Sequence, residues 1–198
     1  MNPLTGFGVE LIRAAEIQTA IERFYEIDRV VNVTDYVRAA RDGEREQLLV
    51  REASDGAVEM MLELPRMRGD LDSMCQIIEG VSHFVYVAER ASRDRASTAL
   101  EMEIQAEVDK WVVLAGDVET LDVAKSAKLR ERLYERVAYL HVESSELGER
   151  YRIANRAALR FLRRMERTCV AERRFGELRR ELHAFFRSGQ EEKLLRAQ

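Results

Sequence analysis

Two ionisable side chains, Glu79 and His83, lie four residues apart in the stretch IIEGVSHFVYVA (residues 77–88), which is otherwise apolar or small. On a helix this spacing places both side chains on one side, and the apolar residues around them predict a segment inside a helical bundle. Buried ionisable groups need partners. The next segment, LEMEIQAEVDKW, offers two, because Glu107 stands where an apolar residue is expected and Glu103 lies one turn earlier.

Glu79, His83, Glu103 and Glu107 form one candidate cluster if their two helices pair antiparallel, as the short connection between them predicts. The interpretation we favour is a satisfied polar network without a cofactor, in which His83 or an arginine such as Arg136 neutralises Glu107. A second interpretation is an iron, manganese or zinc site, although the familiar bundle motif is Glu-x-x-His and not Glu-x-x-x-His. A third is an organic ligand or an acid–base carboxylate.

A second candidate is a row of arginines with steps of 4, 4, 3 and 4 residues, here called the arginine stripe: Arg152, Arg156, Arg160, Arg163 and Arg167. This spacing predicts one exposed basic face on a helix. Guanidinium groups suit both carboxylates and phosphates. The face is therefore either answered by acidic residues of this chain or of a second copy, or used by a protein or nucleic-acid partner. The pI near 5.6 and the lack of interleaved aromatic residues count against nucleic acid.

Charge is distributed unevenly along the chain. Residues 1–149 carry 18 Lys and Arg against 30 Asp and Glu, whereas Arg150 to Arg187 contains 12 Arg against 4 Glu. The opening residues lack a signal-peptide pattern and no run is long enough for a membrane span, so we expect a cytoplasmic protein that does not bind membranes. The isolated Cys75 and Cys169 predict reduced thiols. The common nucleotide-binding and hydrolase motifs are absent.

The candidate residues must be positioned by mostly helical structure. The composition, with 46% hydrophobic residues, 34% charged residues and two prolines, is typical of such a chain. Residues 8–24 have helical spacing, whereas the valines in 30–33 predict a short strand or a loop. REQLLVREASDGAVEMMLELP predicts a β-hairpin with Gly56 left-handed in a three-residue loop. This register pairs Arg51 with Glu59, Val50 with Met60 and Leu48 with Leu62.

Everything after Pro65 has helical patterns. Asp70 predicts a helix start and a helix to about residue 92, Ser97-Thr98 predicts one to about 115, and another begins near Asp122. An a/d seam from 133 to 165 predicts one long helix, although Ser144-Ser145 and Gly148 would also suit a break. A last helix covers about 172–187. We therefore expect an α-dominated α+β fold, a bundle of four or five helices with an N-terminal β-hairpin.

The expected organisation is a helix-plus-hairpin subdomain at 1–66, a helical bundle at 67–188 and a frayed tail at 189–198, all within one compact domain. We expect a non-enzymatic protein-interaction or regulatory module of unknown pathway that holds a protein partner through the arginine stripe or the hairpin surface. The a/d seam at 133–165 is expected to pack within the bundle, with self-association as a secondary use. The alternatives are a metal-dependent (iron, manganese or zinc) helical enzyme that uses the Glu/His cluster and a nucleic-acid-binding protein that uses the stripe.

Overall fold

The predicted hairpin is formed by strands β2 (Gln47–Glu52) and β3 (Val58–Leu64) of the computed structural model, which describes residues 7–52, 58–137 and 142–198. Its register is the predicted one, since Arg51 lies opposite Glu59 and Leu48 opposite Leu62. Gly56 lies outside the described residues. A third strand, β1 (Val37–Ala39), pairs parallel with β3, so the sheet has the order β1-β3-β2.

The short strand considered at residues 30–33 is not formed, because the side chain of Gln18 takes the backbone groups that a strand would use. Its amide nitrogen donates to the carbonyl of Val31 at 2.7 Å, and its oxygen accepts from the N–H of Val33 at 2.9 Å. A 3₁₀ helix, Val33–Asp35, follows, and the chain enters β1 two residues later.

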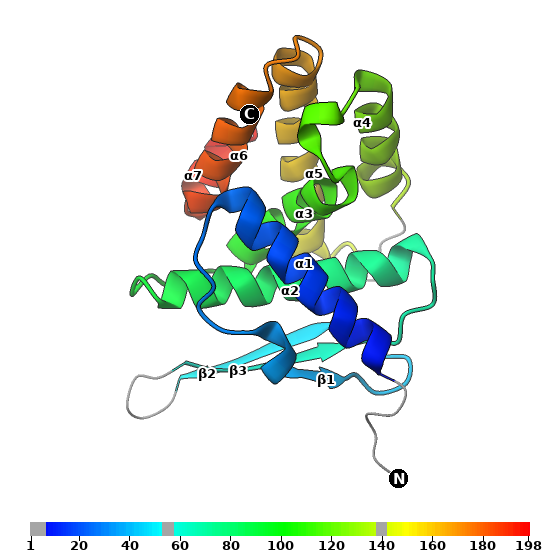
Figure 1. Cartoon of the computed structure of the whole chain (residues 1–198), viewed down its shortest axis with the longest axis vertical. Helices are drawn as coiled ribbons and strands as arrows, with labels where there is room; N and C mark the ends of the chain where they lie inside the picture. The colour runs from blue at the N-terminus through cyan, green and yellow to red at the C-terminus, as the bar shows by residue number, and fades with distance from the viewer. Residues whose placement is uncertain (1–6, 53–57, 138–141) are drawn as a thin grey trace. The chain divides into compact units, whose positions relative to one another are not determined.

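Helix α2 (Leu71–Ala91) covers the apolar face of the sheet, and helix α1 (Gly8–Tyr25) packs on α2 in turn. Helix α2 starts at Asp70, whose carboxylate accepts from the N–H of Ser73 at 2.8 Å, and α2 packs on β3 (Figure 1). Leu62 and Leu64 are fully buried there, and Gly80 of α2 leaves room for both leucines.

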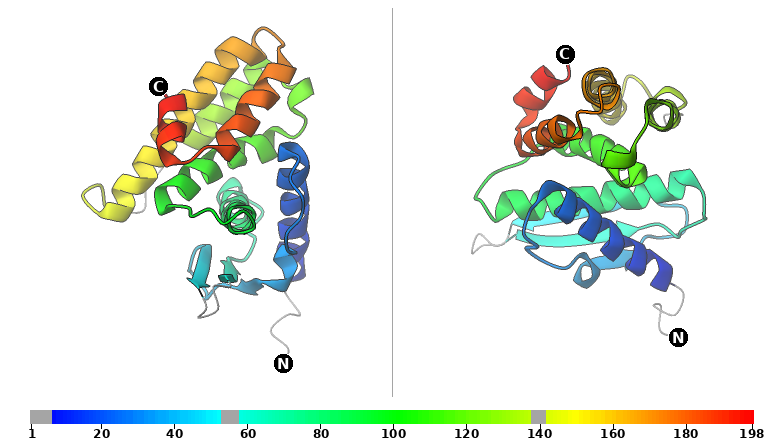
Figure 2. Two further views of the ribbon diagram at one scale, coloured as in Figure 1. Left: turned by 90° about the vertical axis from the view of Figure 1, so that its left-hand side faces the viewer. Right: turned by 45° about the horizontal axis from the view of Figure 1, so that its top comes forward.

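These elements form one of two compact units, Met1–Ala96, and the remaining helices form the other, Ser97–Gln198. Helix α2, which we had grouped with the bundle, therefore belongs with the sheet, because the sheet's leucines need its cover. In its described residues, the second unit contains five α-helices: α3 (Ala99–Ala115), α4 (Val123–Arg130), α5 (Glu146–Met165), α6 (Phe175–Arg187) and α7 (Gln190–Arg196) (Figure 2). The α-dominated α+β prediction is confirmed, with more helices than the four or five expected.

The single long helix predicted across 133–165 is wrong. Helix α4 continues only as a π-helical turn, Glu131–Glu135, and α5 starts afresh after Ser145, whose hydroxyl accepts from the N–H of Gly148 at 3.0 Å. A Cβ on Gly148 would lie 2.1 Å from the carbonyl oxygen of Val142, so the backbone folds back at a place only glycine allows. Residues 138–141 of the predicted seam lie outside the described residues.

The tail predicted to be frayed instead forms α7, in which Lys193 is fully buried. Thr98 and Asp122 cap α3 and α4 as predicted: their side chains accept from the N–H groups of Glu101 and Lys125. In the described part of the chain, no helix is both long and apolar enough to span a membrane.

Candidate functional site

The predicted Glu/His cluster is divided between the two units. Glu79 and His83 lie on α2 in the first unit, with Glu79 buried and His83 half-buried, and Glu103 and Glu107 are buried on α3 in the second. Each pair is described within its own unit. A cluster of all four side chains, and a metal held by it, therefore remain predictions.

Within the second unit, both buried glutamates have basic partners. The carboxylate of Glu107 accepts from the ammonium group of Lys110 at 2.9 Å, one turn further along the same helix. Glu103 lies 3.7 Å from the guanidinium of Arg150 on α5. Arg136, which we expected to neutralise Glu107, instead donates to Glu131 at 2.6 Å. For the α3 pair, this arrangement supports a charge-compensated network.

The arginine stripe lies on α5 and on the π-helical turn that follows it, Glu166–Val170. Its members fall within an arc of about 80° around the helix at 100° per residue. Arg156, Arg160, Arg163 and Arg167 are exposed, whereas Arg152 is half-buried and donates to the carbonyl of Gly148 at 3.0 Å. The sequence therefore predicted the exposed face correctly for four of the five arginines.

The partners of the stripe are few. Arg163 donates to Glu135 at 2.9 Å. Arg156, Arg160 and Arg167 make no hydrogen bond or ion pair with any residue that the structure describes. Among the described residues, these three exposed cations therefore have no acidic partner.

A buried network beside the stripe fixes Glu135. Glu166 is buried and accepts from the hydroxyl of Ser126 at 2.6 Å and from Arg130 at 2.7 Å, and Arg130 also contacts Glu135. Burial alone would lower the pKa of Arg130, but hydrogen bonds and attraction from the two glutamates raise it. The hydrogen bond from Arg163, together with the charges of Arg130 and Arg163, lowers the pKa of Glu135 below its ordinary value. Glu135 therefore remains anionic and holds Arg163, a member of the stripe.

A second buried network escaped the sequence analysis. The ammonium group of Lys193 donates to Gln105 at 2.6 Å and to the carbonyl of Phe185 at 2.5 Å, and Gln105 donates to Asp109 at 2.8 Å. Lys193, Gln105 and Asp109 are all fully buried. The only signal in the sequence was a single lysine among acidic and apolar residues in the tail, which is equally common on exposed helices. This network joins α7 to α3 and α6.

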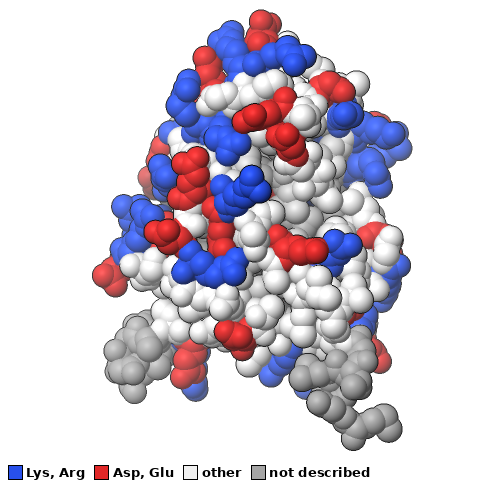
Figure 3. Space-filling view, viewed as in Figure 1, with Lys and Arg blue, Asp and Glu red and all other residues white. Residues whose placement is uncertain are grey.

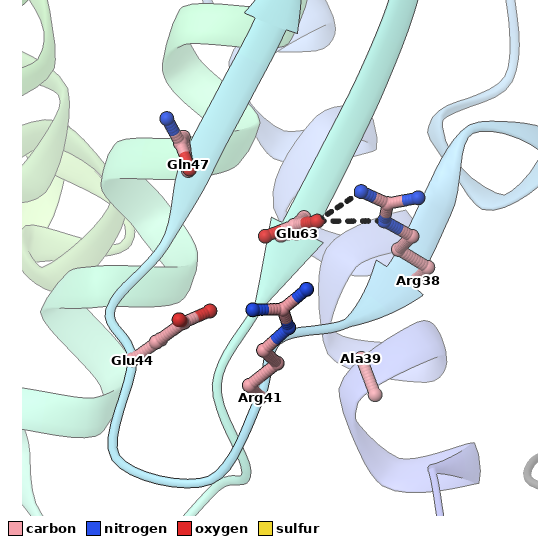
Figure 4. A pocket seen from close by; sticks show the side chains of 6 residues that line it. All are labelled: Arg38, Ala39, Arg41, Glu44, Gln47 and Glu63. Carbon is pink, nitrogen blue, oxygen red and sulfur yellow. Dashed lines mark hydrogen bonds and ion pairs between the residues drawn. The ribbon is translucent and has the colours of Figure 1, made fainter.

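The hairpin surface is the other predicted contact region. On the sheet face away from α2, Arg38, Glu63 and Gln47 form a row across the three strands, with Arg38 bonded to Glu63 at 2.7 Å (Figure 4). A pocket of about 430 Å³ lies along this row. Further along β2, Leu49 and Val50 are exposed.

Comparisons with protein-family models, with curated proteins and with solved structures found no match. The charge and exposure of the side chains on its surfaces therefore indicate what the chain could bind. In the face shown in Figure 3, acidic and basic side chains are interspersed and no large region carries one sign of charge. On α5, Arg156 and Arg160 are exposed one turn apart and make no ion pair with any residue that the structure describes.

Proposed function

We propose that this protein is a non-enzymatic interaction module that holds an acidic segment of a protein partner along the arginine stripe. The observation that supports the proposal is the exposure of Arg156, Arg160 and Arg167 without a carboxylate partner in the described chain. Unpaired guanidinium groups at helical spacing match carboxylates that recur every three or four residues on a partner helix.

The length and strength of the stripe limit what it does. From residue 152 to residue 167 the helix rises about 22 Å, or four turns of a partner helix. An exposed ion pair contributes about 0.2–1 kcal/mol, so the stripe sets orientation and association rate, and a tight complex needs apolar contacts as well. Binding should therefore weaken as salt concentration rises.

Protein is favoured over nucleic acid by the charge of the unit that carries the stripe. Residues 97–198 contain 20 Lys and Arg and 18 Asp and Glu, so the unit has almost no net positive charge to attract a polyphosphate.

The test compares a labelled helical peptide that carries Glu every three or four residues with single-stranded DNA of equal charge, by fluorescence anisotropy at two salt concentrations. Arg156→Glu combined with Arg160→Glu should weaken peptide binding at least about 10-fold, which corresponds to about 1.4 kcal/mol. Arg180→Glu combined with Arg187→Glu is the matched control. It makes the same charge change at exposed arginines of α6 and should alter affinity less than about twofold.

Three results would overturn the proposal. Equal weakening by both double variants would make the interaction a non-specific charge effect. Tighter binding of DNA than of peptide would favour the nucleic-acid alternative. Iron, manganese or zinc at about one equivalent per chain, measured by elemental analysis of unchelated protein, would favour the enzyme alternative.

A further inference from the structure

Strand β2 is an open edge of the sheet. It stands last in the order β1-β3-β2, and within the described residues its backbone pairs only with β3. Its outward-facing N–H and C=O groups are therefore available to another strand. The opposite edge, β1, is only three residues long and offers much less.

The residues of β2 favour pairing. Leu48, Leu49 and Val50 form an apolar run without proline or lysine, and Leu49 and Val50 are 40% and 48% exposed. Sheet proteins usually protect an edge with charges, prolines, bulges or a covering segment. In β2 the charges stand at residues 51 and 52, so the apolar run at 48–50 has no such protection and is open to another strand.

We propose that a second copy of this chain covers it, with the two β2 strands antiparallel about a two-fold axis at Leu49. This register places Leu49 opposite Leu49 of the second copy, Leu48 opposite Val50, and Gln47 opposite Arg51. Every exposed apolar residue of the strand then meets an apolar residue. The two three-stranded sheets become one sheet of six strands.

The apolar pairs select this register, and one row of side chains on the sheet face away from α2 fits it. The row Arg38, Glu63 and Gln47 continues into Arg51 and then Glu59 of the second copy, because Arg51 already pairs with Glu59 at 2.5 Å in its own sheet. Positive and negative side chains thus alternate across the joint, with Gln47 between them. Figure 4 shows the half of this row that lies in one copy.

The neighbouring registers are worse. The same face of both sheets must lie on one side of the joined sheet, so the two-fold axis passes through a residue of β2. An axis at Val50 puts Leu49 opposite Arg51, and an axis at Arg51 puts two arginines opposite each other. An axis at Leu48 puts Val50 opposite Glu46. Like charges directly opposite are unfavourable, as are charges set against apolar side chains. The axis at Leu49 places Glu46 opposite Glu52 at the ends of the strands, but it alone sets Leu48, Leu49 and Val50 entirely against apolar residues.

The proposal is tested by sedimentation and by light scattering across about 1–100 µM, the range typical of modest interfaces. The protein should form dimers, and Leu49→Lys should raise the dimer dissociation constant at least about 30-fold, because two lysines would meet at the axis. The matched control is Ile12→Lys, which places the same charge at a residue of α1 that is 61% exposed and should leave the dimer intact.

Cross-linking tests the register even if Leu49→Lys perturbs the hairpin. Directly opposite residues have Cα atoms about 4.5–5.5 Å apart, within disulfide reach, so Leu49→Cys should give a covalent dimer on mild oxidation. Gln47→Cys should not, because its opposite residue is Arg51. A monomer at all concentrations, a dimer indifferent to Leu49→Lys, or cross-linking of Gln47→Cys as readily as of Leu49→Cys would each overturn the proposal.

Discussion

Replacing Lys193 by methionine should destabilise the second unit by about 3 kcal/mol. The substitution keeps the side-chain volume but removes the donor to Gln105 at 2.6 Å and to the carbonyl of Phe185 at 2.5 Å. Hydrogen bonds from a charged group contribute about 1.5–3 kcal/mol each. These bonds, with a longer one to the carbonyl of Phe186 at 3.5 Å, therefore outweigh the relief of removing a buried cation.

Two features of the structure set that estimate. The N–H of Ser188 also donates to the carbonyl of Phe185, at 3.2 Å, so this oxygen keeps one hydrogen bond in the variant. The loss of stability therefore stays near the low end of the about 3–6 kcal/mol that two charged hydrogen bonds contribute. Against this, α7 has seven residues, too few to be helical without tertiary contacts. Loss of its anchor therefore releases the whole helix from α3 and α6.

The assay is urea unfolding followed by tryptophan fluorescence. Trp111 is the only tryptophan, is fully buried and lies on α3 with Gln105 and Asp109, so its signal reports on this unit. The matched control is Leu195→Met, which introduces the same residue into the same helix at a position 63% exposed and should cost less than about 0.5 kcal/mol.

The refuting result is a free energy of unfolding for Lys193→Met within about 0.5 kcal/mol of the parent at an unchanged urea slope. A double-mutant cycle with Gln105→Met adds a second criterion. If the two side chains act as one network, the cycle should give a coupling energy of at least about 1 kcal/mol. A coupling near zero would show that α7 is held by its apolar contacts instead.

Two further predictions concern Glu135 and Gly80. Glu135→Gln should release Arg163 and strengthen acidic-peptide binding about two- to threefold, at a cost in stability of about 0.5 kcal/mol. Because the pKa of Glu135 is lowered on folding from its ordinary 4.5, its contribution is present above that pH and is lost as pH falls through the folded value, so parent and variant should converge in acid in urea titrations. Gly80→Val should cost about 1–3 kcal/mol in thermal or urea unfolding, since even a Cβ would lie 2.9 Å from Leu64; a neutral effect would show that α2 shifts easily on the sheet.

Local chemistry explains what the sequence predicted well. Asp70, Thr98 and Asp122 start helices through bonds to N–H groups three residues ahead, which depend on a short stretch of chain. The hairpin register followed from one like-charge clash and one favourable pair, Arg51 with Glu59. Such features need no knowledge of distant segments.

The failures depend on distant contacts or on backbone geometry. Lys193 makes α7 a helix through Gln105, which lies 88 residues away, and no periodicity in the tail carries that information. The heptad pattern across 133–165 described a continuous apolar stripe, but the helix start at Ser145 depends on the approach of Gly148 to the backbone of Val142. Apolar spacing predicts which side of a helix is buried and not whether the helix is continuous.

The candidate site illustrates the same distinction. From the sequence, Glu107 is a carboxylate on an apolar helix face, and we expected its partner on another helix. Lys110, three residues further along the same helix, is instead a partner. Exposure of the arginine stripe followed from its spacing, but the division between bridged and unpaired arginines did not. Arg163 is bridged because the π-helical turn before residue 136 brings Glu135 to it, while Arg156 and Arg160 lie beyond that carboxylate's reach.

That division has a functional consequence. A carboxylate already bound to Arg163 makes this position a poor contact for an acidic partner. Arg156 and Arg160 offer two adjacent guanidinium groups that no carboxylate of the described residues occupies. Reversing Arg163 alone should therefore act mainly on stability, through two apposed carboxylates at Glu135, and reversing Arg156 with Arg160 should act mainly on binding. A partner surface therefore differs from a solvated face in a measurable way. On a partner surface, reversing Arg156 with Arg160 weakens binding more than reversing Arg163 does, whereas on a solvated face neither change affects binding.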